Sequence, residues 1–131
     1  FRKPSSQTLQ ENGRIIKEPL DGYDLIQIKP DKQPVGKSDH ARPFKTISCN
    51  VYKGDQLYLF SDGYIDQFGG KNADQRSGGG KKLKTKGFKS LLMSIQNLDL
   101  EEQGKALEHR FIDWRGNLEQ IDDVCVIGIK V

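Results

Sequence analysis

The chain has 131 residues, which is enough for one domain at most. It carries 21 Lys and Arg against 18 Asp and Glu, giving a net charge of +3, and 34% of its residues are hydrophobic. This composition excludes collagen, a coiled coil and a wholly disordered chain. No apolar run approaches the ~20 residues that a membrane-spanning helix needs, and the start of the chain does not have the pattern of a signal peptide. Because Met93 is the single methionine, a chain that opens at Phe1 is expected to be a fragment of a longer protein.

The first half of the chain predicts three strands. Residues 1–22 are polar and turn-rich. The alternation in residues 23–29 predicts a strand, and a proline-rich loop follows. Residues 44–52 also alternate and are expected to pair antiparallel with residues 56–61, through a hairpin turn over residues 53–55. Since residues 57–60 are a continuous apolar run, that strand is expected to be buried on both faces.

The second half predicts helices and a last strand. Residues 64–68 indicate one helical turn, and apolar residues at helical spacing predict a helix over residues 88–98. Asp99 and Glu102 have the spacing of a capping box that opens a second helix, which is expected to end at Gly116. Residues 124–131 are apolar on both faces and predict the final strand. The fold class is therefore α+β, with at least four strands and two adjacent helices.

The segment over residues 69–87 is rich in glycine and strongly basic. It holds six glycines and six Lys or Arg against one Asp, so its local charge of +5 exceeds that of the whole chain. We expect a flexible loop, which could also guide a phosphorylated partner by its charge. Nucleic-acid binding is the alternative, but no aromatic residue lies in the segment to stack bases, and we expect no nucleic-acid partner. The GGGKK of residues 78–82 lacks the spacing of a phosphate-binding loop.

Three aspartates stand at the ends of apolar strands. Asp62 follows the strand over residues 56–61, and Asp122 and Asp123 precede the last strand. If these strands are antiparallel neighbours, the carboxylates converge at one end of the sheet, and their repulsion calls for a cation. A set of oxygen ligands suits Mg²⁺, Mn²⁺ or Ca²⁺. The alternative is that they are ordinary turn aspartates. Asp66, four residues after Asp62, is a metal ligand or a surface residue.

The histidines and cysteines give weaker signals. His40 and His109 show no metal-ligand spacing and are expected to be solvated or hydrogen-bonded within the fold. Cys49 and Cys125 each lie in an apolar strand pattern, so two buried, reduced thiols are expected, with a disulfide or a metal pair as the alternatives. Reduced thiols predict a cytoplasmic location.

Two of these stretches resemble a known family. GDQLYLFSDGYIDQFGG, residues 54–70, resembles the late metal motif of the protein phosphatase 2C-like (PPM) superfamily, and in particular its stage II sporulation protein E branch. WRGNLEQIDDVCVIGIKV, residues 114–131, resembles the C-terminus of that branch, where an Asp-Asp or Asp-Asn pair opens the last strand. LIQIKPDKQPVG, residues 25–36, is similar to the segment before the central hairpin. The resemblance covers roughly residues 23–131.

The resemblance implies an antiparallel β-sandwich flanked by helices, with acidic side chains at one end that hold two Mn²⁺ or Mg²⁺ ions. By position, Asp62 resembles the metal-ligating aspartate of the Ser-Asp-Gly motif, in which Gly63 has a supporting role. Asp122 resembles the ligand that opens the last strand, with Asp123 in support. Asp66 resembles the acidic residue that helps to bind a third ion in some members.

The implied activity is hydrolysis of phosphoserine or phosphothreonine on a signalling protein by water that two metal ions activate. An anti-sigma-factor antagonist or a similar regulator is the implied substrate, and a sensor or regulatory domain is expected upstream. The early metal aspartate and the Asp-x-x-Gly-His-Gly-like segment of the family do not occur in residues 1–131. The chain is therefore expected to be one partial domain, the C-terminal portion, and to be inactive or slow alone. Two ions are expected in the intact domain, and in the fragment the metal positions are either filled or empty.

Three functions remain open at this point. The favoured one is the C-terminal part of a phosphoserine/phosphothreonine phosphatase. The second is a phosphatase-like module that binds a partner without catalysis, and the third is a basic nucleic-acid binder that uses residues 69–87. Half a sandwich would leave sheet edges unpaired, so self-association is also expected.

Overall fold

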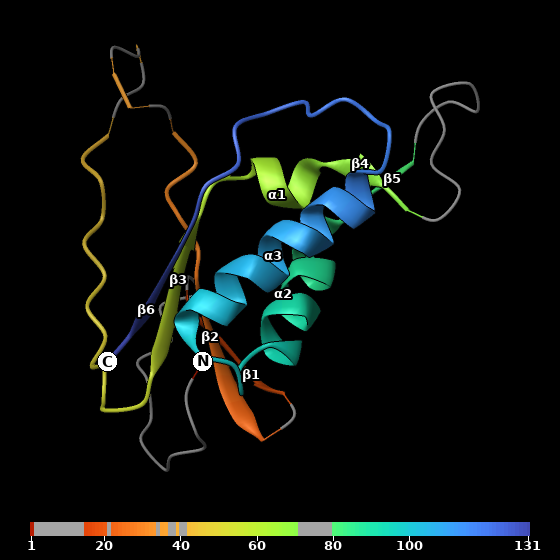
Figure 1. Ribbon diagram of the computed structural model, residues 1–131. Helices are drawn as coiled ribbons and strands as arrows, with labels where there is room; N and C mark the ends of the chain where they lie inside the picture. The colour runs from red at the N-terminus through yellow and green to blue at the C-terminus, as the bar shows by residue number, and fades with distance from the viewer. Residues whose placement is uncertain (2–14, 21, 34, 37–38, 40–41, 71–79) are drawn as a thin grey trace. The chain divides into compact units, whose positions relative to one another are not determined.

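The α+β class is confirmed by a computed structural model, which describes residues 1, 15–20, 22–33, 35–36, 39, 42–70 and 80–131 (Figure 1). Its contacts divide the chain into two compact units, residues 1–55 with Val131 and residues 56–130. The larger unit holds every candidate acidic residue. Within the described residues, none of the helices has the length and apolarity that crossing a bilayer requires.

The smaller unit contains one hairpin. Strand β1, Ile15–Leu20, pairs antiparallel with β2, Tyr23–Ile28, in a register that runs from Ile15↔Ile28 to Leu20↔Tyr23. Strand β2 was predicted, whereas β1 lies in a stretch that the sequence indicated to be turn-rich. Pro19 lies within β1, as is typical of a strand with an open edge. The pairing with β2 therefore explains why β1 is a strand, since its own residue pattern does not predict one.

The strand predicted over residues 44–52 is wrong. Residues 42–52 form neither helix nor strand, so the expected hairpin with residues 56–61 is not formed. Phe44 and Val51 are exposed, and Cys49 is a half-buried free thiol. An alternating pattern forms a strand only where a neighbouring strand takes up its backbone hydrogen bonds, and here residues 56–60 pair with residues 126–130 instead.

The main sheet of the larger unit pairs two strands that are far apart in sequence. Strand β3, Gln56–Phe60, runs antiparallel to β6, Val126–Lys130, in a register from Gln56↔Lys130 to Phe60↔Val126. The prediction that the strand over residues 56–61 is buried on both faces is wrong, and the apolar last strand is also exposed. Exposed apolar side chains mark the outer face, with Leu59 at 61%, Ile127 at 50% and Ile129 at 44% exposure. Cys125 is likewise a free thiol but exposed, not buried as predicted.

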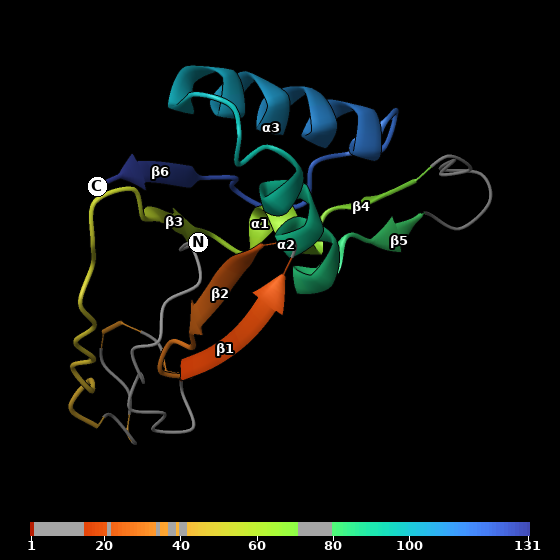
Figure 2. The same cartoon turned by 90° about the horizontal axis from the view of Figure 1, so that it is seen from below.

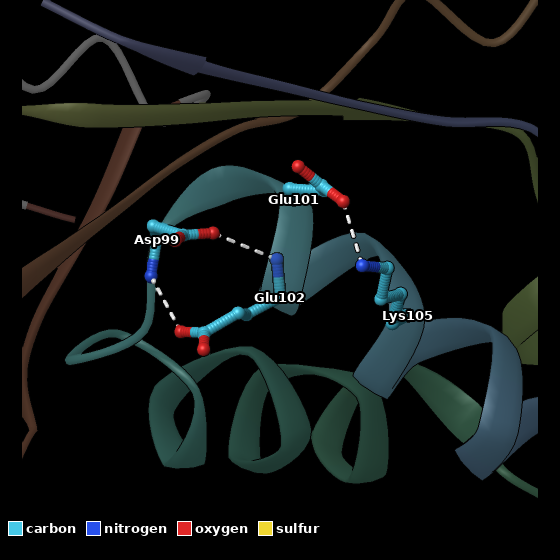
Figure 3. A network of polar contacts seen from close by, with 4 residues as sticks. All are labelled: Asp99, Glu101, Glu102 and Lys105. Atoms are coloured by element: carbon cyan, nitrogen blue, oxygen red, sulfur yellow. Dashed lines mark hydrogen bonds and ion pairs between the residues drawn. The ribbon is translucent and has the colours of Figure 1, made fainter.

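Three helices accompany this sheet: α1, Gly63–Asp66, α2, Lys84–Ser94, and α3, Leu100–Arg115. The predicted capping box of α3 is confirmed. Asp99 Oδ1 accepts from the Glu102 N–H at 2.8 Å, and Glu102 Oε2 accepts from the Asp99 N–H at 3.3 Å (Figure 3). An exposed pair between Lys105 and Glu101, at 2.6 Å, lies on the next turn.

A short strand pair separates α1 from α2. Strand β4, Phe68–Gly69, runs antiparallel to β5, Lys81–Lys82 (Figure 2). The loop predicted over residues 69–87 is thus ordered at both ends, because residues 84–87 form the first turn of α2. Residues 71–79 lie outside the described part of the chain.

Aromatic rings from four elements form the centre of the larger unit. The ring centroid of Phe88 in α2 lies 4.7 Å from that of Phe60 and 4.8 Å from that of Tyr64, and Tyr64 also lies 5.1 Å from Phe111 in α3. The Tyr64 hydroxyl donates to the Leu107 carbonyl at 2.7 Å. Burial raises the pKa of this phenol well above its usual value, against a smaller opposing effect of Arg110, so the donor stays protonated. These contacts fix α1 against both longer helices.

A buried polar network joins β3 to α3 and to the end of α2. The Tyr58 hydroxyl lies 2.6 Å from Gln103 Oε1 and 2.8 Å from Gln56 Oε1, and it accepts from Gln96 Nε2 at 2.8 Å. Gln103 Nε2 donates to Gln56 Oε1 at 2.9 Å and to the Leu98 carbonyl at 3.0 Å. Gln103 is only 2% exposed, so these bonds replace water that the side chain would otherwise bind.

Replacing Gln103 with leucine should destabilise the fold. The variant Gln103→Leu leaves buried partners without their hydrogen bonds and should lower the free energy of unfolding by about 1–3 kcal/mol, measured by urea titration. Glu108→Leu places the same side chain at an exposed position of α3 and should change it by about 0.5 kcal/mol or less. Equal free energies of unfolding for the two variants would contradict the proposed role of the network.

Candidate functional site

The end of β3 lies beside the start of β6, and we call this end of the sheet the rim. The Ser61 N–H donates to the Cys125 carbonyl at 3.0 Å. The Ser61 hydroxyl accepts from the Cys125 N–H at 2.9 Å and donates to the Asp123 carbonyl at 2.8 Å. The antiparallel arrangement on which the convergence of the aspartates depended is therefore confirmed. Ser61 was not singled out in the sequence, although it directly precedes the Asp-Gly pair.

Gly63 brings the two stretches of backbone into direct contact. A Cβ atom at this position would overlap the carbonyl group of Asp123 and would lie 3.3 Å from the carbonyl carbon of Asp122. Any side chain here would push the two stretches apart. The supporting role predicted for Gly63 thus has a clear physical basis, since glycine alone permits this approach.

Asp62 and Asp122 both lie at the rim with exposed side chains. Asp62 is the residue before α1, but its carboxylate does not cap that helix. Asp122 Oδ1 accepts from the Asp123 N–H at 2.8 Å, and the Asp122 carbonyl accepts from Gln120 Nε2 at 2.9 Å. The backbone therefore places Asp62 and Asp122 on adjacent stretches, and each keeps carboxylate oxygen available to solvent.

Asp66 lies one helical turn beyond Asp62, and its N–H donates to the Asp62 carbonyl at 2.9 Å. Its carboxylate pairs with Lys82 of β5, with 3.1 Å between Oδ2 and Nζ. Both side chains are partly exposed, at 43% for Asp66 and 38% for Lys82. Metal binding by Asp66 stays a prediction, and the structure adds Lys82 as a cationic neighbour that the sequence did not reveal.

The described residues contain no group of three or more His, Cys, Asp and Glu side chains arranged to hold a metal ion. The rim supplies two carboxylates from adjacent backbone instead. His109 lies exposed on α3 and His40 lies outside the described residues, so neither is placed at the rim.

The strand pair β4–β5 is fixed in place by Gln67 and Trp114. Gln67 is fully buried, and its Nε2 donates to the Glu119 carbonyl at 2.9 Å. The Gln67 carbonyl accepts from Trp114 Nε1 at 3.0 Å and from the Leu83 N–H at 3.3 Å. Gly69 leaves no room for a Cβ atom against the Trp114 carbonyl. Lys82 also lies over the ring of Phe68, 5.7 Å from its centroid. The chain that carries Lys82 is thereby held near α1.

Comparison with known proteins agrees with this geometry. The sequence matches the stage II sporulation protein E (SpoIIE) family over residues 19–131. A solved structure, the SiaA-PP2C domain of Pseudomonas aeruginosa, is similar with a TM-score of 0.59 and 23% sequence identity.

That similarity covers 69% of this chain and 34% of the SiaA-PP2C chain, so the present chain spans about a third of its length. It shows a shared fold. Comparison with curated proteins gives no match. The resemblance drawn from the two aspartate motifs is confirmed: the chain belongs to the stage II sporulation protein E family, within the PPM superfamily.

Proposed function

We propose that the chain is the C-terminal part of a metal-dependent protein phosphatase domain that acts on phosphoserine or phosphothreonine. The observation that carries the proposal is the contact of Gly63 with the backbone of Asp122 and Asp123, which brings Asp62 and Asp122 to one rim. Membership of the SpoIIE family and the fold shared with a PP2C domain support the same assignment.

The chemistry of the rim fits Mg²⁺ or Mn²⁺. Its candidate ligands, Asp62 and Asp122, offer only carboxylate oxygen, which these hard ions prefer. Mg²⁺ is commonly held by one or two protein carboxylates and completes its coordination with water and substrate phosphate. The fit therefore does not require a third carboxylate from the described residues. In the proposed domain two ions bind, and the remaining ligands come from outside this chain.

The residues of the rim would have two roles. Asp62 and Asp122 would hold the ions. Ser61, Gly63 and the backbone of Asp123 would hold the two stretches of chain together, so that the two carboxylates stay close to each other. When bound, the ions would supply a lowered pKa for water and a positive charge that offsets the charge of the phosphoryl oxygens. The proposed substrate is a phosphorylated signalling protein, such as an anti-sigma-factor antagonist, under the control of a sensor or regulatory domain upstream. The proposal includes a cytoplasmic location, which the two free cysteines support.

A non-catalytic partner-binding module is the second candidate. The small number of metal ligands favours it, because the described residues place only two of the candidate carboxylates together. In addition, the early metal motifs of the family do not occur in residues 1–131. Such a module would bind a phosphoprotein without depending on Mn²⁺.

Metal affinity tests the site. Asp62→Asn and Asp122→Asn should each weaken Mn²⁺ binding by about tenfold or more, because each removes a charged oxygen ligand. Gly63→Ala should have a similar effect, because it separates the two stretches without removing a carboxylate. Isothermal titration calorimetry would measure the dissociation constants. Asp113→Asn, an exposed change of the same type on α3, is the matched control. Unchanged Mn²⁺ affinity in all four variants would refute the metal site.

The rate of hydrolysis tests whether this chain alone holds a complete metal site. With Mn²⁺ present, the 131-residue chain should hydrolyse a phosphothreonine peptide far more slowly than the ~10 s⁻¹ that is typical of enzymes, because its metal site is incomplete. Release of inorganic phosphate measures the rate. A rate near that value would show that the described carboxylates suffice and that the ligand count given above is wrong.

Self-association is a further part of the proposal. Within the described residues each sheet has two strands, so one edge of β3 and one edge of β6 are unpaired. The sedimentation coefficient should therefore rise with protein concentration. Ile127→Lys, which puts a charge on the exposed β6, should reduce this rise, whereas Ile112→Lys on the exposed side of α3 should not. A sedimentation coefficient independent of concentration would exclude self-association.

A further inference from the structure

A run of lysines begins beside the rim. Residues 81–86 have the sequence KKLKTK, with four lysines and no acidic residue, and we call this run the lysine segment. Lys81, Lys84 and Lys86 are exposed, and none of them forms an ion pair with a described residue. Six residues span at most about 20 Å even when fully extended, so at ~0.01 M salt, where the Debye length is about 30 Å, the four charges act together on a partner that approaches.

The segment lies close to the rim because Lys82 pairs with Asp66. Lys82 Nζ is 3.1 Å from Asp66 Oδ2, and the Asp66 N–H is 2.9 Å from the Asp62 carbonyl. Four residues of helix rise by only about 6 Å, so Lys82 pairs with a residue that lies one helical turn beyond the candidate metal ligand Asp62. Figure 1 shows the same order, with α1 directly following β3 and leading to β4 and β5.

Two features of the lysine segment are energetically unfavourable: the backbone conformation of Lys84 and the position of lysines at the start of α2. Lys84 has a positive φ of 62°, a conformation that favours glycine, and the first turn of α2 contains no acidic residue. Lysines at the start of a helix are disfavoured by the helix dipole. The backbone is nevertheless fixed by the β4–β5 pairing and by the hydrogen bond from Leu83 to Gln67. A fixed cluster of like charges is suited to a partner of opposite charge.

We propose that the lysine segment binds an acidic stretch of the phosphoprotein substrate, next to the phosphorylated residue that enters the rim. The inference rests on the proposed function and extends it to the class of substrate. Single surface ion pairs contribute little, but several lysines together raise the rate of encounter with an acidic partner and select against basic ones. An acidic protein fits better than a nucleic acid, because the segment contains no aromatic side chain on which bases could stack.

The test compares two triple variants with equal changes in charge. Lys81→Gln/Lys84→Gln/Lys86→Gln neutralises the segment but keeps Lys82, so that its pair with Asp66 is retained. The control, Lys45→Gln/Lys53→Gln/Lys130→Gln, changes lysines that are equally exposed, with Lys130 at the end of β6 that lies away from the rim. The probes are two phosphothreonine peptides that differ only in acidic or neutral flanking residues, followed by fluorescence anisotropy in the presence of Mn²⁺.

The unmodified chain should bind the acidic peptide about tenfold or more tightly than the neutral one at ~0.01 M salt, with a smaller ratio at ~0.15 M. The segment variant should lose most of this preference, and the control should keep it within about twofold. No preference in the unmodified chain, or an equal loss in both variants, would overturn the proposal. Tighter binding of a DNA duplex than of the acidic peptide would overturn it in favour of nucleic acid.

The same measurements separate this inference from the function on which it rests. A flank preference in a chain that shows no Mn²⁺ binding would support acidic docking while counting against the metal site. Normal Mn²⁺ affinity together with no flank preference would support the metal site and count against acidic docking.

Discussion

The antiparallel pairing of β3 with β6 determines where the acidic residues of this chain can act. Had the strands been parallel, Asp62 and Asp122 would stand at opposite ends of the sheet. Closing the long connection between the strands costs chain entropy, which the packing of α2 and α3 must offset. The aromatic cluster around Phe88 therefore matters for the rim, because it packs Phe60 of β3 against α1 and α2.

The larger unit separates neutral polar groups from charged ones. Among its described residues, the buried polar side chains are all glutamines: Gln56, Gln67, Gln96 and Gln103. Burial raises the pKa of Tyr58, against the opposing hydrogen bonds of Gln96 and Gln103, so this phenol also stays neutral at physiological pH. The described interior of this unit therefore holds neutral polar side chains, whereas the carboxylates of the rim and three of the four lysines of the lysine segment are exposed.

Local signals in the sequence were the most reliable guide to the fold. The capping box at Asp99 and the stop at Gly116 depend on neighbouring residues alone, and both are confirmed. The alternation over residues 44–52 failed because a strand also needs a partner, and no local pattern supplies one. Gln103 fits the buried stripe of α3 by its spacing, but as a polar residue it was passed over. It became a core residue only because Gln56 and Tyr58 provide its hydrogen bonds.

The site could also be predicted only in part, because contacts between residues that are distant in the sequence determine the rest of it. The ends of two apolar strands indicated Asp62 and Asp122, because strand ends can be read from the sequence. The hydroxyl bonds of Ser61 and the pairing of Lys82 with Asp66 depend on contacts between distant residues, which spacing does not reveal.

The contact at Gly63 is between main-chain atoms and depends on the absence of a side chain at that position. The close approach of the two backbone stretches thus depends on a different residue from the proposed metal binding. Exchange of the aspartates for uncharged residues would keep glycine at position 63, so the proposed catalysis could be lost without loss of the fold. Enzymes and non-catalytic receptors could therefore descend from one architecture without passing through an unfolded ancestor.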